Sequence, residues 1–291
     1  MWNILSYTLI VTNIKSRMKY FQVFLLVLAN LVVMYTSNSI DMGQGLPLLS
    51  QCASWIILIL TWILPLAEEK ALSLRGTTVV TGLFTLYLLM STSYELWFLL
   101  CLILFLYCWN KKELSGSNLS SLSVDFTSRS IVEHQISMDD VRTSFIYLLS
   151  ITLAFFGTGN IASLNSFEPA SMFCFLTVFN PFSMAALLLL KVIIPFIVVA
   201  CGFHIITSQT GTKQDGVFLI ILLMSDLMGM HFFMWVQDYG SWLDIGTSIS
   251  HYVITLVTTL VLIILSKFSQ FIMTYCILPA KYYKSFSHKH S

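Results

Sequence analysis

The chain has 291 residues, of which 57% are hydrophobic and only 10% are charged, and its formal net charge is +1. Soluble globular proteins carry about 25% charged residues, so this composition excludes a chain whose surface mostly faces water. The near-neutral charge gives no indication of a nucleic-acid partner. The six cysteines lie in or beside apolar segments without a CxxC pair, and we interpret them as small packing residues rather than metal ligands or disulfides.

A helix that crosses a membrane needs about 20 consecutive apolar residues. Apolar segments that approach this length recur along the chain, and they cover residues 21–35, 48–66, 77–90, 96–109, 144–156, 181–206, 217–236 and 251–277. We therefore predict an all-α fold, a polytopic transmembrane helical bundle of about eight spans.

The polar segments between these spans set the predicted organisation. It comprises a short apolar and basic N-terminal segment (1–20), four helices (21–109), a polar cytoplasmic loop (110–142), a second helical group with two lumenal Gly-, Asn- and Asp-rich loops (143–277) and a basic cytoplasmic tail (278–291). One further apolar segment, 172–179, is too short to cross. It either enters and leaves the membrane on one side or lies at the membrane surface.

The basic residues predict the orientation. When the gaps between spans are assigned alternately to two sides, every Lys and Arg except Lys191 falls on one side or, for Lys267, near it in the last span. The positive-inside rule places that side in the cytoplasm. The glycosylation sequon at Asn118 is then cytoplasmic and is expected to stay unmodified.

Two loops on the opposite, lumenal side, 156–169 and 237–250, combine Gly, Asn, Asp and Ser with apolar residues. Functional residues concentrate on such loops. Their candidate contacts for lipid or for a partner are Asn160, Asn165, Glu168, Asp238, Trp242 and Asp244.

The alternative interpretation of these loops is local. Gly157 and Gly159 suit a helix C-terminus, and Asp244 or Ser248 suits a helix N-cap. Trp242 fits an interfacial aromatic belt.

Ionisable residues inside the spans are further candidates, because their burial in lipid is costly. They are Lys191, Asp226 and His231, with His204 nearer a helix end and His251 at the start of the last span. Lys191 and Asp226 each lie about 15 Å from the lumenal ends of their spans, which predicts a pair between them. Snorkelling of Lys191 toward the headgroups is the alternative.

Catalytic signatures are missing from the sequence. We find no HExxH, GxSxG or Walker A motif and no compact Asp and His cluster for two metals. The residues alone therefore predict a membrane domain without a catalytic constellation, and no metal or cofactor in this chain.

Several stretches resemble the C-terminal membrane domain of the PIG-N family of GPI ethanolamine phosphate transferases. These stretches are QGLPLLSQ (44–51), FFGTGNIASLNSF (155–167), FCFLTVFNPF (173–182), SDLMGMHFF (225–233) and DYGSWLDIGTSISHYVI (238–254). The resemblance covers residues 44 to the C-terminus and does not extend to the first twenty or so residues.

The resemblance implies a protein of the endoplasmic reticulum membrane that acts in GPI-anchor synthesis. The family transfers phosphoethanolamine from phosphatidylethanolamine to the first mannose of the GPI precursor. Its lumenal, alkaline-phosphatase-like domain carries a nucleophilic Thr and zinc ligands, and no position of this chain matches that motif. The chain is therefore expected to be a fragment, a truncated gene model or a short isoform that anchors the catalytic domain and presents lipid substrates.

Two other functions remain open from the sequence. A lipid or small-solute transporter would use Pro-interrupted helices and charges at mid-membrane depth, as at Pro181, Pro195, Lys191 and Asp226, but no internal repeat is visible. A non-catalytic membrane assembly subunit is the other alternative.

Overall fold

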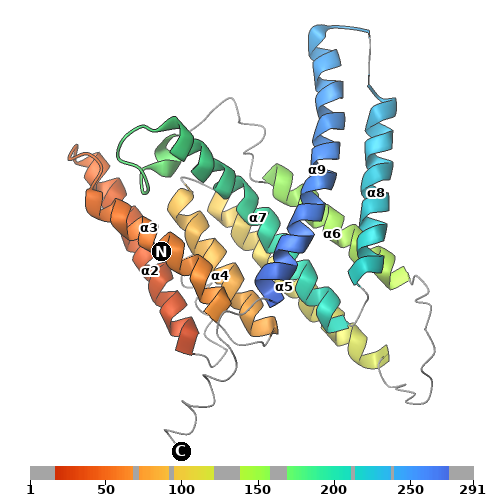
Figure 1. Ribbon diagram of the computed structural model, residues 1–291, viewed down its shortest axis with the longest axis horizontal. Helices are drawn as coiled ribbons and strands as arrows, with labels where there is room; N and C mark the ends of the chain where they lie inside the picture. Colours follow the sequence, from red (N-terminus) through yellow and green to blue (C-terminus); the bar gives the residue numbers. More distant parts are fainter. Residues whose placement is uncertain are drawn as a thin grey trace, which may run out of the picture. The chain divides into compact units, whose positions relative to one another are not determined.

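The computed structural model describes residues 17–67, 72–91, 95–120, 138–157, 169–210, 214–236 and 239–274. Within these ranges the chain is helical and has no strand (Figure 1). The helices are α2 (Arg17–Asp41), α3 (Leu48–Ala67), α4 (Leu72–Met90), α5 (Glu95–Ser120), α6 (Met138–Gly157), the short 3₁₀ helix η1 (Pro169–Met172), α7 (Pro181–Thr210), α8 (Gln214–Met234) and α9 (Trp242–Thr274). The all-α prediction is therefore confirmed.

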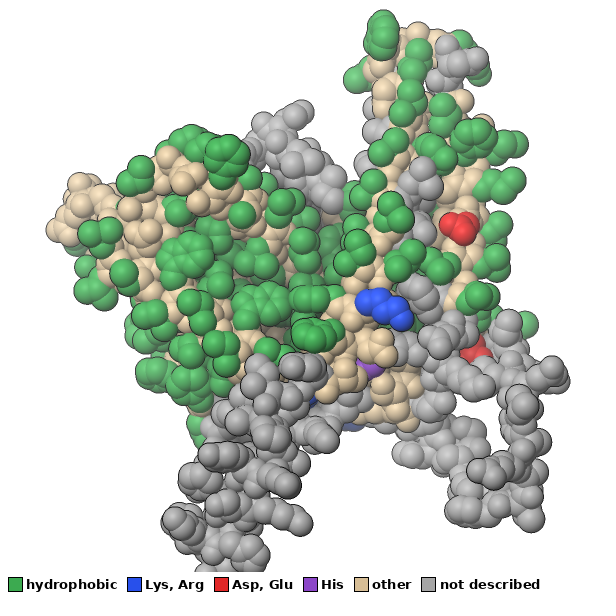
Figure 2. Space-filling model, viewed as in Figure 1, with side chains coloured by type: hydrophobic (Ala, Val, Ile, Leu, Met, Phe, Trp, Pro, Cys, Tyr) green, Lys and Arg blue, Asp and Glu red, His purple; other side chains and the backbone are tan. Residues whose placement is uncertain are grey.

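Three of the described helical stretches are long and apolar enough to cross a membrane: Tyr20–Asp41, Leu48–Leu66 and Pro181–Gln209. Two shorter apolar stretches, Leu219–Met234 and Leu260–Thr274, lie in α8 and α9. Each predicted span coincides with one helix, but the total of about eight crossings stays a prediction. Hydrophobic side chains cover much of the face drawn in Figure 2. Exposed apolar side chains in such number are typical of a surface covered by lipid or protein.

Two predicted boundaries differ from the structure. Helix α5 continues to Ser120, so the first part of the polar segment 110–142 is helical. Helix α9 begins at Trp242, so most of the predicted loop 237–250 is helical as well. The Ile245 amide donates to the Ser241 carbonyl (3.1 Å), which makes Ser241 the residue that precedes the helix in the N-cap position. Neither Asp244 nor Ser248 therefore caps α9, and the Ser248 hydroxyl bonds the Ile245 carbonyl inside the helix instead.

The chain divides into two compact units. The first comprises Met1–Leu104, Phe155–Val198 and Phe271–Ser291, and the second comprises Phe105–Ala154 and Val199–Gln270. Because the division falls within several helices, each unit contains parts of elements that continue into the other.

Helices α2, α3 and α4 pack against one another in the first unit, around fully buried Ile57, Phe84 and Tyr87. The Thr81 and Thr85 hydroxyls are also buried there, and each donates to the carbonyl four residues earlier. A Cβ added at Gly82 would lie 3.2 Å from the Thr61 carbonyl oxygen, so the glycine lets α4 approach α3 closely. Small and hydroxyl-bearing residues at helix contacts are typical of membrane proteins.

A tight turn joins α2 to α3. Gly43 and Gly45 have φ angles of 69° and 80°, which L-residues with a side chain adopt rarely. The Ser39 hydroxyl donates to the Gly45 carbonyl (2.8 Å) and closes the turn. The two helices therefore leave this turn as neighbours.

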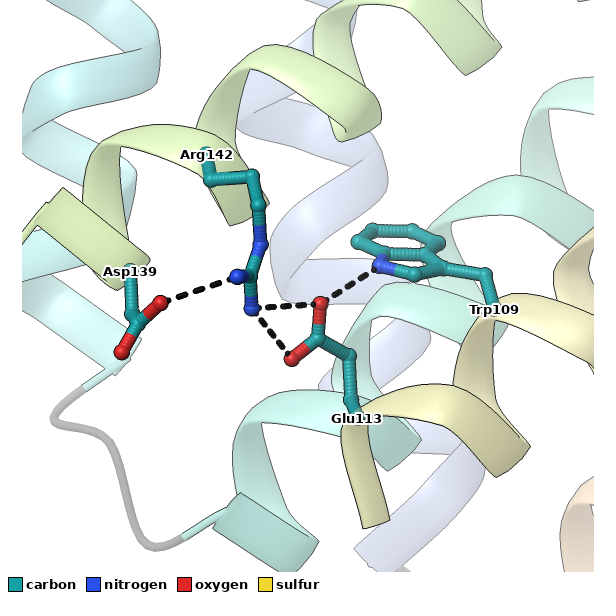
Figure 3. A network of polar contacts seen from close by, with 4 residues as sticks. All are labelled: Trp109, Glu113, Asp139 and Arg142. Atoms are coloured by element: carbon teal, nitrogen blue, oxygen red, sulfur yellow. Dashed lines mark hydrogen bonds and ion pairs between the residues drawn. The ribbon is translucent and has the colours of Figure 1, made fainter. Parts of the chain in front are cut away.

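A polar cluster in the second unit joins the later part of α5 to the beginning of α6 (Figure 3). Arg142 Nη2 lies 2.8 Å from Glu113 Oε2, and its Nη1 lies 2.9 Å from Asp139 Oδ1. Trp109 Nε1 donates to Glu113 Oε1 (3.2 Å). The carboxylate of Glu113 is mostly buried and accepts from both neighbours, so the cluster ties together the two ends of the intervening polar segment.

Candidate functional site

The strongest candidate site is a buried ion pair in the first unit. Lys191 Nζ, from α7, lies 2.7 Å from Glu95 Oε2, from α5. The two side chains are 5% and 15% exposed. Removing one member of such a pair leaves an uncompensated buried charge, which typically costs about 3–5 kcal/mol. The pair is therefore a strong constraint on how α5 and α7 pack.

Local sequence explains why each charge lies where it does. Glu95 is the first residue of α5, where a carboxylate is favoured by the unpaired amides and the positive end of the helix dipole. Lys191 lies one turn before Pro195, which is inside α7 and has no N–H for the Lys191 carbonyl. Both charged residues therefore lie in helical turns where a backbone amide or carbonyl lacks its usual hydrogen bond within the helix.

A close contact supports the first turn of α5. The described part of α6 extends to Gly157, and a Cβ built on Gly157 would overlap the ring of Phe98. The backbone φ of Gly157 is not positive, so the glycine serves the close approach rather than a turn. Phe98 lies three residues after Glu95, and its position helps to fix the helix start that carries the acid.

The apolar segment that leads into α7 folds onto α3. Trp55 Nε1 donates to the Phe175 carbonyl (3.1 Å), and the two rings meet edge to face with centroids 5.7 Å apart. The Thr177 hydroxyl donates to Gln51 Oε1 (3.3 Å), and Phe175 is fully buried. Residues 172–179 thus form a docked turn rather than a helix of their own, which agrees with the prediction that this segment does not cross.

Comparison with known proteins identifies the family. A family model described as Phosphatidylinositolglycan class N (PIG-N) matches residues 1–241. The chain belongs to the PIG-N family. The matched region includes Glu95, the docked turn, Lys191 and the whole of α8.

Curated relatives extend this result. The chain is 42% identical over 262 residues to the human protein named GPI ethanolamine phosphate transferase 1, an alignment that covers 87% of the chain and 28% of the relative. The mouse protein of that name is 42% identical over 257 residues, and the Aspergillus fumigatus protein is 30% identical over 256 residues. This PIG-N-family chain thus spans about a quarter of their length. No solved structure matches it.

The structure corrects the predicted partner of Lys191. Depth along the spans suggested Asp226, but the ammonium pairs with Glu95. Glu95 was counted with the short loop before the fourth span, whereas it is the first helical residue of α5. The signal that could have found it is an acid at a helix N-terminus on the predicted lumenal side, where the span of α7 is also predicted to begin.

The other candidate residues lie in different environments or outside the described residues. Asp226 and His231 are exposed on α8 in the second unit, and the His231 ring lies 5.9 Å from the Trp235 ring. Trp242 begins α9 and is 91% exposed. The structure places Asp244 and His251 within α9 without describing their side chains, and Asn160, Asn165, Glu168 and Asp238 lie outside the described residues. A role for any of these residues in lipid or partner contact stays a prediction.

The described part of the chain contains no group of three or more His, Cys, Asp or Glu side chains that could hold a metal ion. Its five described cysteines are free thiols, two of them buried. The described geometry offers positioning of helices by a paired cation and anion, Lys191 and Glu95.

Proposed function

We propose that this chain is the membrane module of a phosphoethanolamine transferase of GPI-anchor synthesis, which transfers ethanolamine phosphate to the first mannose of the GPI precursor. The observation that carries the proposal is the family match over residues 1–241 together with 42% identity to the human relative. Its apolar helices suit a multi-pass protein of the endoplasmic reticulum membrane. Its basic loops and C-terminus would face the cytoplasm.

In this proposal the chemistry belongs to a zinc-dependent catalytic domain outside this sequence. The chain anchors that domain and presents phosphatidylethanolamine and the GPI precursor to it. The predicted topology puts Glu95 and the docked turn 172–179 on the lumenal side. The ion pair and the turn would then hold α5 and α7 in fixed positions close to the membrane surface at which the lipids react.

Complementation in cells that lack the transferase tests this proposal. We would express the chain alone, then with the part of the human relative that precedes the matching region, and score GPI-anchored proteins at the cell surface. Restoration only by the two parts together is the expected result. Restoration by the chain alone would place catalytic residues within it, and failure of both with the protein stably inserted would favour a transporter or an assembly subunit.

A chimera sharpens the experiment. This chain would replace the matching region of the human relative, which removes the requirement that two separate polypeptides assemble. Lys191→Ala in the chimera should reduce surface GPI-anchored proteins, because the helices that carry the pair lose their fixed packing. Lys267→Ala, which removes an exposed lysine from α9, is the matched control and should leave the level unchanged.

A further inference from the structure

The pair of Glu95 and Lys191 has unused hydrogen-bonding capacity. Among the described residues, the 2.7 Å contact between Lys191 Nζ and Glu95 Oε2 is the one polar contact that either side chain makes. It is a contact of charges rather than an aligned hydrogen bond, since the buried Oε2 has no hydrogen-bond donor in the described part of the chain. A buried acceptor without a donor is costly, and an ammonium has three N–H groups to donate. The pair is therefore able to take further polar partners.

Stability alone does not explain why this pair lies between apolar helices. A buried ion pair is seldom more stable than well-packed apolar side chains of similar volume, because the loss of hydration offsets the attraction of the charges. Ionisable residues within membrane helices commonly mark the places where a protein handles a substrate or an ion. Both considerations favour a binding role in addition to the packing of α5 and α7.

The position of Glu95 on α5 places the pair next to lipid headgroups. From Glu95 to Lys111 the helix rises about 24 Å without a charged residue in between, which approaches the thickness of the hydrocarbon core. Trp97 is 53% exposed, and tryptophan is enriched at the level of the headgroups. In the predicted topology this is the lumenal interface. Because the Glu95 side chain is more exposed than that of Lys191, a headgroup reaches the carboxylate first.

The chemistry of the pair matches one type of headgroup. Phosphoethanolamine carries a phosphate and a primary ammonium joined by two carbons, so it is itself a pair of opposite charges. Its phosphate beside Lys191 and its ammonium beside Glu95 would form a ring of four alternating charges without separating the two residues. A purely anionic headgroup would be repelled by Glu95, and the quaternary ammonium of choline has no N–H to donate to the carboxylate.

We propose that Lys191 and Glu95 bind a phosphoethanolamine group, with Lys191 donating to its phosphate and Glu95 accepting from its ammonium. This inference deepens the proposed function and rests on it, since the bound group would belong to a lipid of the transfer reaction. The same group occurs in the donor, phosphatidylethanolamine, and in a mannose that has received ethanolamine phosphate.

Lipid retention by the purified chain tests the binding directly. The full chain would be placed in nanodiscs with equal amounts of phosphatidylethanolamine and phosphatidylcholine, and the lipids that stay bound after brief extraction would be counted by native mass spectrometry. We expect phosphatidylethanolamine to be enriched about tenfold, as one charged hydrogen bond allows. Equal retention of the two lipids would overturn the proposal. This comparison uses the unmodified chain, so it does not depend on whether a variant folds.

The double variant Lys191→Met with Glu95→Gln assigns the preference to the pair. It removes both charges at similar side-chain volume and should abolish the enrichment, while its melting temperature reports that it is folded. Lys267→Met, which removes an exposed lysine from α9, is the matched control and should keep the enrichment. An unchanged preference in the folded double variant would overturn the proposal. Displacement of the lipid by a soluble mannose that carries ethanolamine phosphate would show that the site takes the product as well, and no displacement would assign it to the donor.

Activity in the chimera separates binding from packing. If the pair only packs α5 against α7, the double variant should restore surface GPI-anchored proteins together with stability, and that result would overturn the proposal. We expect the double variant to be stable and yet to leave these proteins as low as Lys191→Ala does. An inactive unmodified chimera would count against the transferase role, whereas the lipid preference of the chain would still test the binding site.

Discussion

Lys191 in α7 and Asp226 in α8 are both charges on apolar helices, but their surroundings differ. Lys191 is buried in the first unit and lies 2.7 Å from Glu95. Asp226 is exposed on a face of leucine, methionine and phenylalanine. The first charge is neutralised by a buried partner, whereas the second is exposed among apolar side chains. Burial therefore distinguishes a charge that constrains the packing of its own helices from one that does not.

Lys191→Ala should have the largest effect on stability. It leaves the Glu95 carboxylate buried without its cation, and we expect a loss of about 3–5 kcal/mol. The thermal unfolding of purified protein in detergent and its steady-state level in cells would both measure the change.

The double variant Lys191→Met with Glu95→Gln is the control for that experiment. Because it removes both charges while keeping similar side-chain volumes, it should recover most of the lost stability. A double variant as unstable as the single one would show that the two charges act separately, and the contrast with Asp226 would then lose its basis.

Gly157→Ala tests whether the close contact between Gly157 and Phe98 stabilises the first turn of α5, which carries Glu95. The new Cβ would overlap the Phe98 ring, and displacement of that ring disturbs the first turn of α5. Overpacking of this kind typically costs about 1–3 kcal/mol. Gly202→Ala is the matched control, because its Cβ would meet Leu106 at an ordinary 3.5 Å and alanine favours the helix. Similar melting temperatures for the two variants would mean that Phe98 moves aside freely.

These positions also show what the sequence can predict. The spans follow directly from apolar runs, so each predicted span coincides with a helix. The pair between Glu95 and Lys191 was missed because it joins two helices that are distant in the chain, and helix depth alone does not identify which neighbours touch. The start of α9 was missed because Gly246 and nearby Ser and Thr residues predict a loop, whereas they lie inside the helix.

Trp55→Phe separates a hydrogen bond from the packing of the docked turn. Phenylalanine keeps an aromatic ring against Phe175 but cannot donate to its carbonyl. We expect a loss of about 1 kcal/mol and faster proteolysis between residues 169 and 180. The entry to α7 is anchored in this way, whereas the turn between α8 and α9 exposes Trp235 and Trp242. Trp242→Phe is therefore the control, and it should leave both stability and proteolysis unchanged. Equal changes in stability and proteolysis for the two variants would show that the docked turn is no better anchored than the turn between α8 and α9.

Asp226→Leu should have the smallest effect on the isolated chain. Since the side chain is exposed, its replacement removes no buried charge, and we expect the melting temperature in detergent to change by no more than about 1–2 °C. The steady-state level of the same variant in cells should likewise stay close to that of the unmodified chain. Lys191→Ala should differ from it and lower both the melting temperature and the level in cells. A large loss of stability from Asp226→Leu in detergent would mean that this carboxylate, like that of Glu95, is satisfied within its own chain.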